Sequence, residues 1–377
     1  MSIPPVGSIR LQSSDRGVEK PLDWNFAIRL AEEIDGIHPY PAKFISEIPA
    51  TFLDEFPRPE GMILDPFSGS GTTLVQAQKR GLKAAGVDVN PIACLISRVK
   101  TSPVPAGAAH EFERVLQQAQ RISSQIPSIP RLDHWFDTVV QEEVAALLYA
   151  IDESAAVYHD ILRLALSSIL VRVSNQESDT RYAAVKKARK PGDTYRVFFA
   201  AGNRILSALE KRPYDPKGVD VYQASTLKFN FKSLKEPVSA VITSPPYPNA
   251  YEYWLYHKYR MYWLGYDPQL VKAEEIGARA HFFKTNGHTA ENFVEQMRTT
   301  LASISQVLNP LGYAAFVVGR SKIHGAIVDN AKIIEDVGSE LGFRVEYRAE
   351  RKIAATRKSF NLAHANIKTE TILVLAR

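Results

Sequence analysis

Short apolar runs that end in polar or turn-forming residues recur along the chain and predict the strands of one sheet. Met62–Leu64 stops at Asp65, and Lys83–Asp88 ends in a second acid. Continuous apolar runs of this length are typical of strands that are buried on both faces. Further strands are predicted at Val219–Gln223, Val238–Thr243 and Tyr313–Val318, followed by a closing antiparallel pair at Phe343–Arg351 and Thr369–Ala376.

Segments with a helical pattern follow the first two of these predicted strands. Thr72–Arg80 reads as a helix after the first strand, and Asn90 with Pro91 forms the N-cap and first turn of another helix. Strand, turn and helix in this order predict an α/β fold with a doubly wound, Rossmann-like sheet, mostly parallel with an antiparallel closing strand. The ligand crevice of such a sheet lies at the carboxyl ends of its strands.

Residues 101–217 carry a different pattern. Apolar residues recur at helical spacing over Glu111–Ile126 and Val139–Leu170, without a strong strand signal. We therefore expect a helical insertion at 101–217 in an α/β domain formed by residues 38–100 and 218–377, after an N-terminal arm of residues 1–37. Ile45, Ile48 and Phe52 predict a helix that Pro49 would kink or break, and the aromatic run from Tyr251 to Trp263 predicts a largely buried helix.

A glycine-bearing turn, Gly69-Ser-Gly71, joins the first strand to its helix. Glycines allow unusual φ angles and close backbone approach, and the following helix offers free N–H donors. A Walker loop would need a lysine where Thr72 stands, and a dinucleotide fingerprint would need a glycine where Leu74 stands. S-adenosylmethionine is the third ligand considered, and Asp88, roughly 20 residues past the glycines, lies where such folds bind ribose hydroxyls. The alternative role of Asp88 is a capping turn.

Composition narrows the class of protein. The chain has 377 residues, 45% of them hydrophobic and 23% charged, as in ordinary globular proteins. No apolar run approaches a membrane span and Met1–Lys20 lacks an apolar signal core, so we expect a cytoplasmic protein. The single cysteine, Cys94, excludes an internal disulfide and argues against a thiolate metal site. A net charge of +5 favours a polyanionic partner.

A basic segment closes the predicted insertion. It interleaves cations with aromatic residues and comprises Arg181, Tyr182, Lys186, Lys187, Arg189, Lys190 and Tyr195. Such a run can be simply a solvated face. Cations beside aromatic side chains also fit contacts to phosphates and bases. A second basic connection runs from Arg348 to Lys358 and includes Arg357.

The tetrapeptide Ser244-Pro245-Pro246-Tyr247 follows a predicted buried strand. Prolines cannot continue a central strand, so the chain must turn outward there, beside the crevice. The Ser244 hydroxyl and the Pro245 carbonyl would then accept hydrogen bonds from an exocyclic amine, and the Tyr247 ring would stack on a base lifted from the duplex. The alternative is a Pro-Pro turn that only ends a strand.

Together the motifs resemble those of the amino-methylating DNA methyltransferases, which act on cytosine N4 or adenine N6. Asp65-Pro-Phe-Ser-Gly-Ser-Gly71 is similar to the family's cofactor loop, and Thr243-Ser-Pro-Pro-Tyr247 is similar to its catalytic motif. His38-Pro-Tyr-Pro-Ala-Lys-Phe44 resembles the segment that precedes the cofactor loop and helps close the methionine end of the pocket. The resemblance covers residues 38–100 and 219–377.

The resemblance implies an S-adenosylmethionine-dependent catalytic domain, with Ser244, Pro245, Pro246 and Tyr247 as catalytic residues. The residues expected to bind cofactor are His38, Lys43, Phe44, Asp65, Pro66, Phe67, Gly69, Gly71, Thr72, Asp88, Val89 and Ser225. Those expected to bind nucleic acid are Tyr182, Lys186, Lys187, Arg189, Lys190, Arg357 and Lys358. A serine at the first position of the motif usually goes with cytosine N4, and an aspartate with adenine N6.

Two departures from the family pattern affect these expectations. Gln223-Ala224-Ser225 lacks the acid that often binds the adenine of the cofactor. The long insertion also leaves the target-recognition region open between residues 101–217 and the Gly265–His288 loop. Double-stranded DNA is the expected partner, and the resemblance also suggests a cognate restriction endonuclease.

Four other functions compete with cytosine-N4 transfer. Adenine-N6 transfer differs by one motif residue, and RNA guanine-N2 methyltransferases share a similar motif but usually carry a separate RNA-binding module. A non-catalytic nucleic-acid-binding subunit would have no need of intact Asp65, Asp88, Ser244 and Tyr247. Cytosine-C5 transfer needs a cysteine nucleophile, and Cys94 lies within an apolar helix, where we expect a buried structural thiol.

Overall fold

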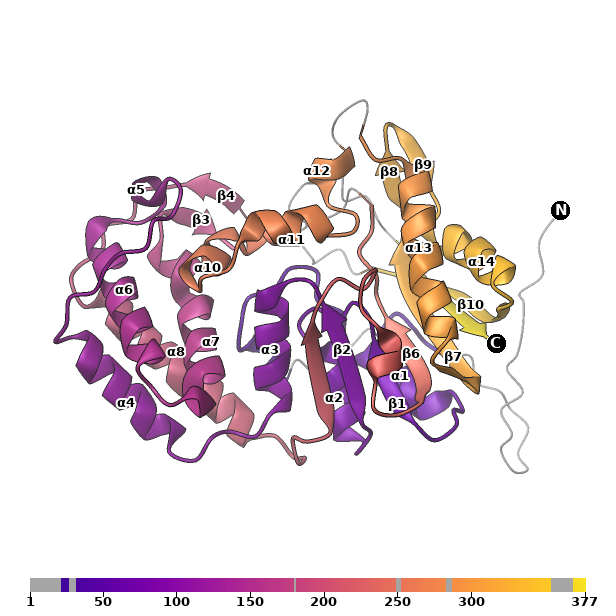
Figure 1. The fold of residues 1–377 in the computed structure, drawn as a ribbon, viewed down its shortest axis with the longest axis horizontal. Helices are drawn as coiled ribbons and strands as arrows, with labels where there is room; N and C mark the ends of the chain where they lie inside the picture. The colour runs from indigo at the N-terminus through magenta and orange to yellow at the C-terminus, as the bar shows by residue number, and fades with distance from the viewer. Residues whose placement is uncertain (1–21, 27–31, 180, 249–251, 283–286, 354–368) are drawn as a thin grey trace.

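The computed structural model describes residues 22–26, 32–179, 181–248, 252–282, 287–353 and 369–377. Within them, a seven-stranded sheet has the strand order β10-β11-β7-β6-β1-β2-β5 (Figure 1). The strands are β1 (Met62–Asp65), β2 (Ala84–Asp88), β5 (Val219–Gln223), β6 (Val238–Thr243), β7 (Leu308–Gly319), β10 (Arg344–Lys352) and β11 (Thr369–Ala376). Neighbours from β5 to β7 are parallel, whereas β11 is antiparallel to β7 and β10. The predicted doubly wound, mostly parallel sheet is therefore confirmed.

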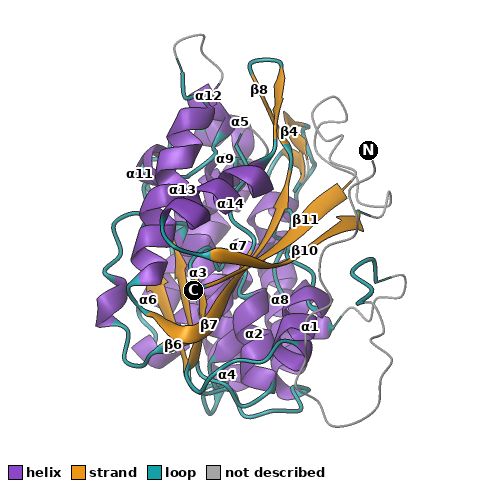
Figure 2. Cartoon of the chain, turned by 90° about the vertical axis from the view of Figure 1, so that its right-hand side faces the viewer, coloured by secondary structure: helices purple, strands orange, loops and turns teal. Residues whose placement is uncertain are grey.

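Helices cover both faces of the sheet because the strand side chains alternate between two apolar clusters (Figure 2). Ile63 and Ile242 face one layer, which contains α1 (Glu47–Glu55) and α2 (Thr72–Lys79). Leu64 and Val241 face the other, which contains α13 (Ala290–Ser305) and α14 (Asn330–Glu340). Burial of each large apolar side chain contributes about 1.5–3 kcal/mol, so these two clusters hold the strands and their loops in place.

Residues 101–217 form a mainly helical unit that packs against α3 (Pro91–Thr101), which follows β2. Its helices are α4 (Ala108–Ala119), α5 (Leu132–Trp135), α6 (Thr138–Asp152), α7 (Ala156–Val173) and α8 (Asp193–Glu210). One apolar cluster runs through this unit, α3 and α10 (Lys258–Trp263), with Leu95 and Trp263 among its buried members. The insertion is thus joined to the elements of the sheet domain through a common core.

The expectation of an insertion without strands is wrong at one place. β3 (Gln176–Ser178) and β4 (Arg181–Ala184) form an antiparallel hairpin. These strands are too short to show an alternating pattern. The hairpin is instead fixed by contacts from elsewhere, such as Tyr182 against Trp135, whose ring centroids are 4.6 Å apart.

Two helix predictions also need correction. Helix α1 passes through Pro49 without interruption, because Pro49 is the third residue of the helix, where the backbone N–H has no partner within the helix. The aromatic run forms two short helices, α9 (Tyr253–Tyr256) and α10, separated at His257, and Tyr251 lies outside the described residues.

The remaining elements lie around the carboxyl ends of the strands or connect the layers. They are the 3-10 helices η1 (Glu33–Gly36) and η2 (Phe231–Ser233), the helices α11 (Pro268–Glu274) and α12 (Arg279–Phe282), and the hairpin β8 (Ser321–Ile323) and β9 (Ala326–Val328). Among the described residues, no helix combines the length and the apolar character needed to cross a membrane.

Candidate functional site

The candidate site lies where the strand order of the sheet reverses, between β1 and β6. From β1 the chain adds β2 and β5 on one side and β6 and β7 on the other. Asp65 ends β1 and Thr243 ends β6, and the Thr243 hydroxyl donates to Asp65 Oδ1 at 2.6 Å. Ligands of doubly wound sheets bind at such a reversal, at the carboxyl ends of the strands. The predicted cofactor loop and the predicted catalytic motif therefore begin at two hydrogen-bonded residues.

Asp65 is buried, and its carboxyl group accepts a hydrogen bond from the Phe67 amide at 3.1 Å as well as from Thr243. Burial raises the pKa of Asp65 to about 6, although the hydrogen bonds from Thr243, Thr73 and Phe67 oppose this effect. The carboxyl group thus organises the start of the loop, while Pro66 and Phe67 continue from it. Phe67 packs against the cluster on the α13 side, and the Pro66 carbonyl accepts from the Thr226 hydroxyl beyond β5.

The glycine turn adopts the backbone that its sequence predicts. Gly69 and Gly71 have φ angles of 47° and 78°, in the left-handed region, and Gly71 is the N-cap of α2, which begins at the buried Thr72. A Cβ on Gly71 would lie 2.7 Å from the Ser97 Oγ atom, and that hydroxyl donates to the Gly69 carbonyl at 2.9 Å. The turn is therefore pressed against α3 and has no room for a side chain.

Asp88 lies beside the same turn at the end of β2. Its carboxylate accepts from the Gly69 and Asn90 amides, both at 2.8 Å. Burial raises the pKa of Asp88 to about 6, while these two hydrogen bonds favour the charged form. Each oxygen keeps a lone pair for a further donor. The next residue, Val89, is half-buried and packs against the cluster that contains α3.

The lead-in segment, residues 38–44, reaches the glycine turn mainly through a residue that the sequence analysis did not single out. A Cβ on Gly69 would lie 3.3 Å from the Tyr40 hydroxyl, so the phenol covers the turn. The Tyr40 ring stacks on Tyr253 with centroids 5.7 Å apart. The signal that could have identified Tyr40 in the sequence is its position as an aromatic residue between two prolines.

The three predicted residues of this segment have other contacts. The buried His38 ring bonds the Ser167 hydroxyl of α7 at 2.9 Å and the Pro39 carbonyl at 2.6 Å. The Lys43 ammonium donates to the Asp35 and His38 carbonyls, and burial lowers its pKa to about 8. Phe44 packs against the cluster on the α1 side. These residues hold the lead-in segment, and Tyr40 makes its contact with the turn.

The predicted catalytic motif turns away from β6 toward β7 and β11. The Ser244 hydroxyl donates to the Val317 carbonyl at 3.0 Å and lies 3.3 Å from the Tyr247 hydroxyl. The Tyr247 hydroxyl lies 3.2 Å from the same carbonyl and 3.1 Å from Glu370 Oε1. Pro245 is buried and Pro246 is half-buried. Burial and the Glu370 carboxylate raise the pKa of Tyr247 well above its usual value, so the phenol stays protonated.

Cys94 is fully buried in α3, and burial raises the pKa of its thiol far above the usual value. The predicted burial of this thiol is therefore confirmed. Ser225 is buried just beyond β5, where its carbonyl accepts from the Lys228 and Phe229 amides.

The predicted nucleic-acid residues of the insertion divide into two groups. Lys187 donates through its ammonium group to the Gln176 and Val171 carbonyls, and Arg189 donates to the Arg172 carbonyl. Tyr182 is half-buried against Trp135, and these three side chains therefore hold the β3–β4 region together. Lys186 and Lys190 are exposed and remain candidates for phosphate contacts.

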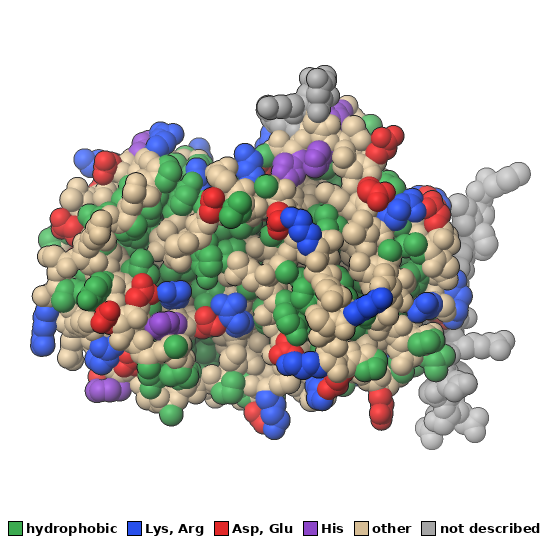
Figure 3. Space-filling view, in the orientation of Figure 1, with side chains coloured by type: hydrophobic (Ala, Val, Ile, Leu, Met, Phe, Trp, Pro, Cys, Tyr) green, Lys and Arg blue, Asp and Glu red, His purple; other side chains and the backbone are tan. Residues whose placement is uncertain are grey.

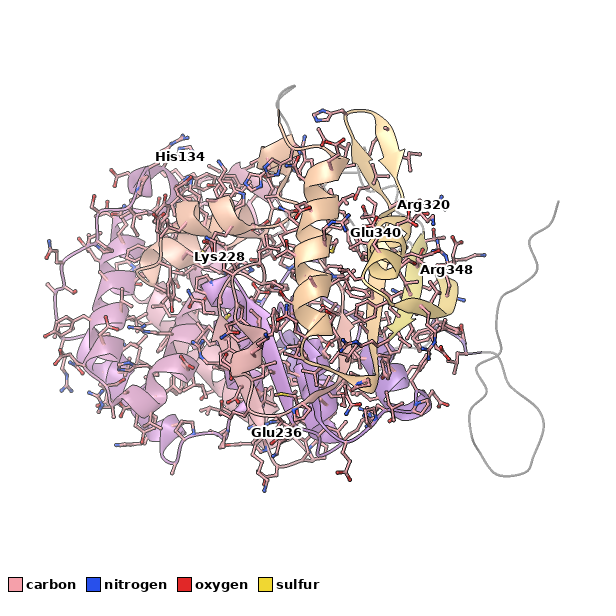
Figure 4. All side chains as sticks on the ribbon, turned by 45° about the vertical axis from the view of Figure 1, so that its right-hand side comes forward. His134, Lys228, Glu236, Arg320, Glu340 and Arg348 are labelled. Atoms are coloured by element: carbon pink, nitrogen blue, oxygen red, sulfur yellow. The ribbon has the colours of Figure 1, made fainter. Side chains whose placement is uncertain are left out.

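The second basic connection, from Arg348 to Lys358, offers less to nucleic-acid binding than its composition indicates. The Arg348 guanidinium pairs with Glu335 at 2.5 Å and with Asp329 at 3.9 Å, beside α14 (Figure 4). Arg357 and Lys358 lie outside the described residues. On the face seen in Figure 3, cations and carboxylates are interspersed. This face therefore carries no continuous basic stripe over the described residues.

Several residues of the site carried no recognisable pattern in the sequence. Gly86 has no space for a Cβ, which would lie 2.6 Å from Leu74 Cδ1 and 2.8 Å from Ser68 Cβ. Glu275 is buried and accepts from the Tyr253 and Trp254 amides, and burial raises its pKa to about 8. Glu370 comes from the last strand. A motif search finds none of these, because each acts through a partner that is distant in sequence.

Comparison with known proteins agrees with the geometry. Residues 13–98 match the family model of N6- and N4-type methyltransferases, described as DNA methylase. The Type II methyltransferase M.MjaII of Methanocaldococcus jannaschii is 44% identical over 85 residues, which are 21% of this chain and 16% of that protein. The Type II methyltransferase M.MvaI of Kocuria varians is 24% identical over 247 residues, which are 56% of this chain and 53% of that protein.

Among solved structures, the rRNA methyltransferase AviRa of Streptomyces viridochromogenes aligns with a TM-score of 0.34 at 11% identity, covering 92% of this chain and 90% of AviRa. The matched part of this chain spans about half the length of M.MvaI and a smaller share of M.MjaII. The family match covers the lead-in segment, the glycine turn, Asp88 and most of α3. Over residues 13–98 the chain is similar to the amino-methylating DNA methyltransferases, and its matches to Type II methyltransferases agree with this similarity.

Proposed function

We propose that this protein is a site-specific DNA methyltransferase that methylates the exocyclic N4 amino group of a flipped-out cytosine. The observation that carries the proposal is the hydrogen bond between Asp65 and Thr243. It joins the cofactor loop to the Ser-Pro-Pro-Tyr motif at the point of the sheet where ligands bind. A methyl donor and a target amine bound at these two loops would meet at one crevice.

S-adenosylmethionine is the cofactor of this family, and the residues present fit it. Gly71 in the loop and Gly86 in β2 leave no room for a side chain, because a Cβ on either residue would clash with neighbouring side chains. The buried Ser68 hydroxyl has no hydrogen-bond partner among the described residues, and Asp88 keeps free lone pairs toward a ribose. Asp65, the turn and Asp88 would hold the cofactor under Tyr40. When bound, the cofactor supplies a methyl group on a positively charged sulfur.

The chain's own contribution to the chemistry is to position the amine. The amino group of cytosine is a poor nucleophile because its lone pair is delocalised into the ring. The Ser244 oxygen and the Pro245 carbonyl would accept its two N–H bonds and favour a tetrahedral nitrogen with a localised pair. Oriented acceptors of this kind supply much of an enzyme's rate enhancement without moving during the reaction.

The Tyr247 ring would hold the extruded base. Flipping a base out of the duplex costs a few kcal/mol, and stacking on an aromatic ring returns about 1–3 kcal/mol. The motif begins with Ser244 and not with an aspartate. By resemblance to the family, this supports cytosine over adenine as the target base. Adenine N6 is the alternative target of the same site.

The proposal is tested by incubating the protein with labelled S-adenosylmethionine and unmethylated genomic DNA, followed by nucleoside analysis by mass spectrometry. N4-methylcytosine is the expected product. N6-methyladenine would keep the enzyme class and overturn the base assignment. Label in a parallel reaction with RNA, but not in the reaction with DNA, would indicate the guanine-N2 alternative. Cofactor binding without transfer to either polymer would indicate a non-catalytic subunit.

Cofactor affinity should depend on pH through Asp88. Its carboxyl has a pKa of about 6, so it is ionised and a strong acceptor above pH 6 and protonated below. We expect affinity for S-adenosylhomocysteine to fall by up to about tenfold per pH unit below 6, as one required proton loss implies. Titration calorimetry between pH 5 and 8 measures this, and Asp88→Asn should reduce the slope.

Unfolding would not explain that loss of affinity. The folded pKa of Asp88 lies above its ordinary value of 3.8, so the folded state binds the proton more tightly than the unfolded state does. Its contribution to stability therefore increases as pH falls from 6 toward 4. An affinity that stays constant from pH 8 to 5 would contradict the ribose-binding role.

DNA binding should depend on Lys186 and Lys190. Each phosphate contact adds about 0.9 to the slope of log affinity against log salt, so Lys186→Ala with Lys190→Ala should lower that slope by about 2. Lys187→Ala is the matched control, because its ammonium group bonds carbonyls within the insertion. It should lower thermal stability and leave the slope unchanged. An unchanged slope in the double variant would place the DNA elsewhere, such as at the Gly265–His288 loop.

The partners and the cellular setting follow from this activity. We propose double-stranded DNA as the substrate, cytoplasm as the location and a cognate restriction endonuclease as a functional partner, since the matched relatives are named Type II methyltransferases. Residues 101–217 are the proposed target-recognition region. Expression in a host that carries candidate endonucleases, followed by digestion of its DNA, would reveal any site that the protein protects.

A further inference from the structure

The last strand of the sheet places a carboxylate on the catalytic motif. Glu370 in β11 has Oε1 3.1 Å from the Tyr247 hydroxyl. The same hydroxyl lies 3.2 Å from the Val317 carbonyl and 3.3 Å from Ser244 Oγ, and Ser244 Oγ lies 3.0 Å from that carbonyl. Two hydroxyl groups thus share one carbonyl oxygen, and one of them also faces the carboxylate.

Only one assignment of hydrogen-bond donors and acceptors gives each of these groups a suitable partner. Tyr247 and Ser244 each have one proton to donate, whereas the carbonyl and an ionised carboxylate can only accept. Hydrogen bonds to a charged acceptor are about twice as strong as neutral ones, so Tyr247 donates to Glu370. Ser244 then donates to Val317, and its lone pairs remain free.

We propose that Glu370 is a positioning residue that sets the direction of the Ser244–Tyr247 hydrogen bonds, so that Ser244 presents an acceptor to the target amine. The inference rests on the proposed function, in which the amine donates to Ser244. Without the carboxylate, the Tyr247 proton turns toward Val317 or Ser244. In the first case Ser244 must share the Val317 carbonyl with a second donor, and in the second a Ser244 lone pair is occupied.

The Glu370 carboxylate is held in position by neighbours outside the motif. Arg351, 3% exposed, pairs with Glu370, and its Nε donates to the Trp24 carbonyl at 3.1 Å. The Trp24 indole in turn donates to the Tyr347 hydroxyl at 2.8 Å. The ion pair with Arg351 therefore fixes the position of the Glu370 carboxylate.

A double-mutant cycle tests the proposal. Glu370→Gln removes the charge, and Tyr247→Phe keeps the ring but removes the competing proton. We expect Glu370→Gln to lower kcat by about tenfold or more, as the loss of one charge-assisted hydrogen bond implies, with the KM for S-adenosylmethionine unchanged. Tyr247→Phe is the reference background of the cycle. In this background Glu370→Gln should lower kcat no further, because the hydroxyl group that Glu370 holds is absent.

Two controls separate positioning from structural support. Glu350→Gln removes an exposed carboxylate of the neighbouring strand that pairs with Arg320 at 3.8 Å, and should change nothing. If Glu370 served only to neutralise Arg351, Glu370→Gln would lower kcat equally in both backgrounds. That result would overturn the proposal.

A measurement that needs no activity completes the test. Ultraviolet difference titration against Tyr247→Phe follows the Tyr247 phenol, whose pKa the Glu370 carboxylate raises. The phenol should ionise at lower pH in Glu370→Gln. An unchanged titration would show that Glu370 does not hold this hydroxyl. If the wild-type protein transferred no methyl group, the proposed function would fail, while this titration would still decide the contact.

Discussion

Replacing Ser244 by alanine is expected to abolish methyl transfer while leaving cofactor binding intact. Ser244 lies on the proposed catalytic motif, whereas the glycine turn and Asp88 belong to the separate loops that we propose to bind the cofactor. Removing one oriented hydrogen-bonding group from an active site typically lowers kcat by about a hundredfold to a thousandfold. The rate of label transfer to genomic DNA measures the loss, and calorimetry with S-adenosylhomocysteine measures binding.

Tyr247→Ala should have a comparable effect for another reason, because it removes the stacking surface for the extruded base, worth about 1–3 kcal/mol. Tyr149→Ala, which removes a tyrosine that is 47% exposed on α6, is the matched control and should keep full activity. Retained transfer in Ser244→Ala would assign the acceptor role to backbone carbonyls alone. Retained transfer in Tyr247→Ala would exclude stacking at this residue.

Gly71→Ala is expected to weaken cofactor binding by at least about tenfold and to lower the unfolding temperature. The substitution places a Cβ at φ 78°, which costs about 1–2 kcal/mol, and sets it 2.7 Å from Ser97 Oγ and 3.1 Å from Ser97 Cα. The turn can accommodate the methyl group only by moving away from α3. That movement would displace the Gly69 amide from Asp88.

Gly81→Ala provides the control for backbone strain. Gly81 has a φ of 67°, but a Cβ there would meet nothing within 4 Å. It should therefore lower stability by about 1 kcal/mol and leave cofactor binding unchanged. Gly71→Ala combined with Ser97→Ala should recover part of the affinity, since the closest contact is removed. Equal effects of Gly71→Ala and Gly81→Ala would mean that the contact with α3 is unimportant.

The sequence predicted the sheet and the glycine turn because both depend on local chemistry. Buried parallel strands need continuous apolar runs, as at Val238–Thr243, and left-handed turns need glycine, as at Gly69 and Gly71. The acids that end β1 and β2 were predicted because the ends of parallel strands meet at one edge. Each of these features is determined by residues that are only a few positions apart in the sequence.

Features that depend on distant partners were not predicted. Glu370 meets Tyr247 across 123 positions of sequence, and nothing in either segment indicates the contact. The basic run was read as one group, yet Lys187 donates to carbonyls while Lys186 is exposed, a difference set by how the β3–β4 hairpin folds back on α7. Charge can be read from a sequence, but the side to which a charge points requires the fold.

The shared core of α3, α10 and residues 101–217 has a consequence for engineering the proposed target-recognition region. A recognition unit with its own core can be exchanged between enzymes as a cassette. Here Leu95, Trp263 and the insertion helices bury one another, and Arg260 of α10 pairs with Asp179 of the β3–β4 region while its Nε donates to the Ser167 carbonyl at 3.0 Å. Transplanting this unit would expose the apolar surface of α3 and leave buried charges unpaired. New specificity must therefore be introduced one exposed side chain at a time.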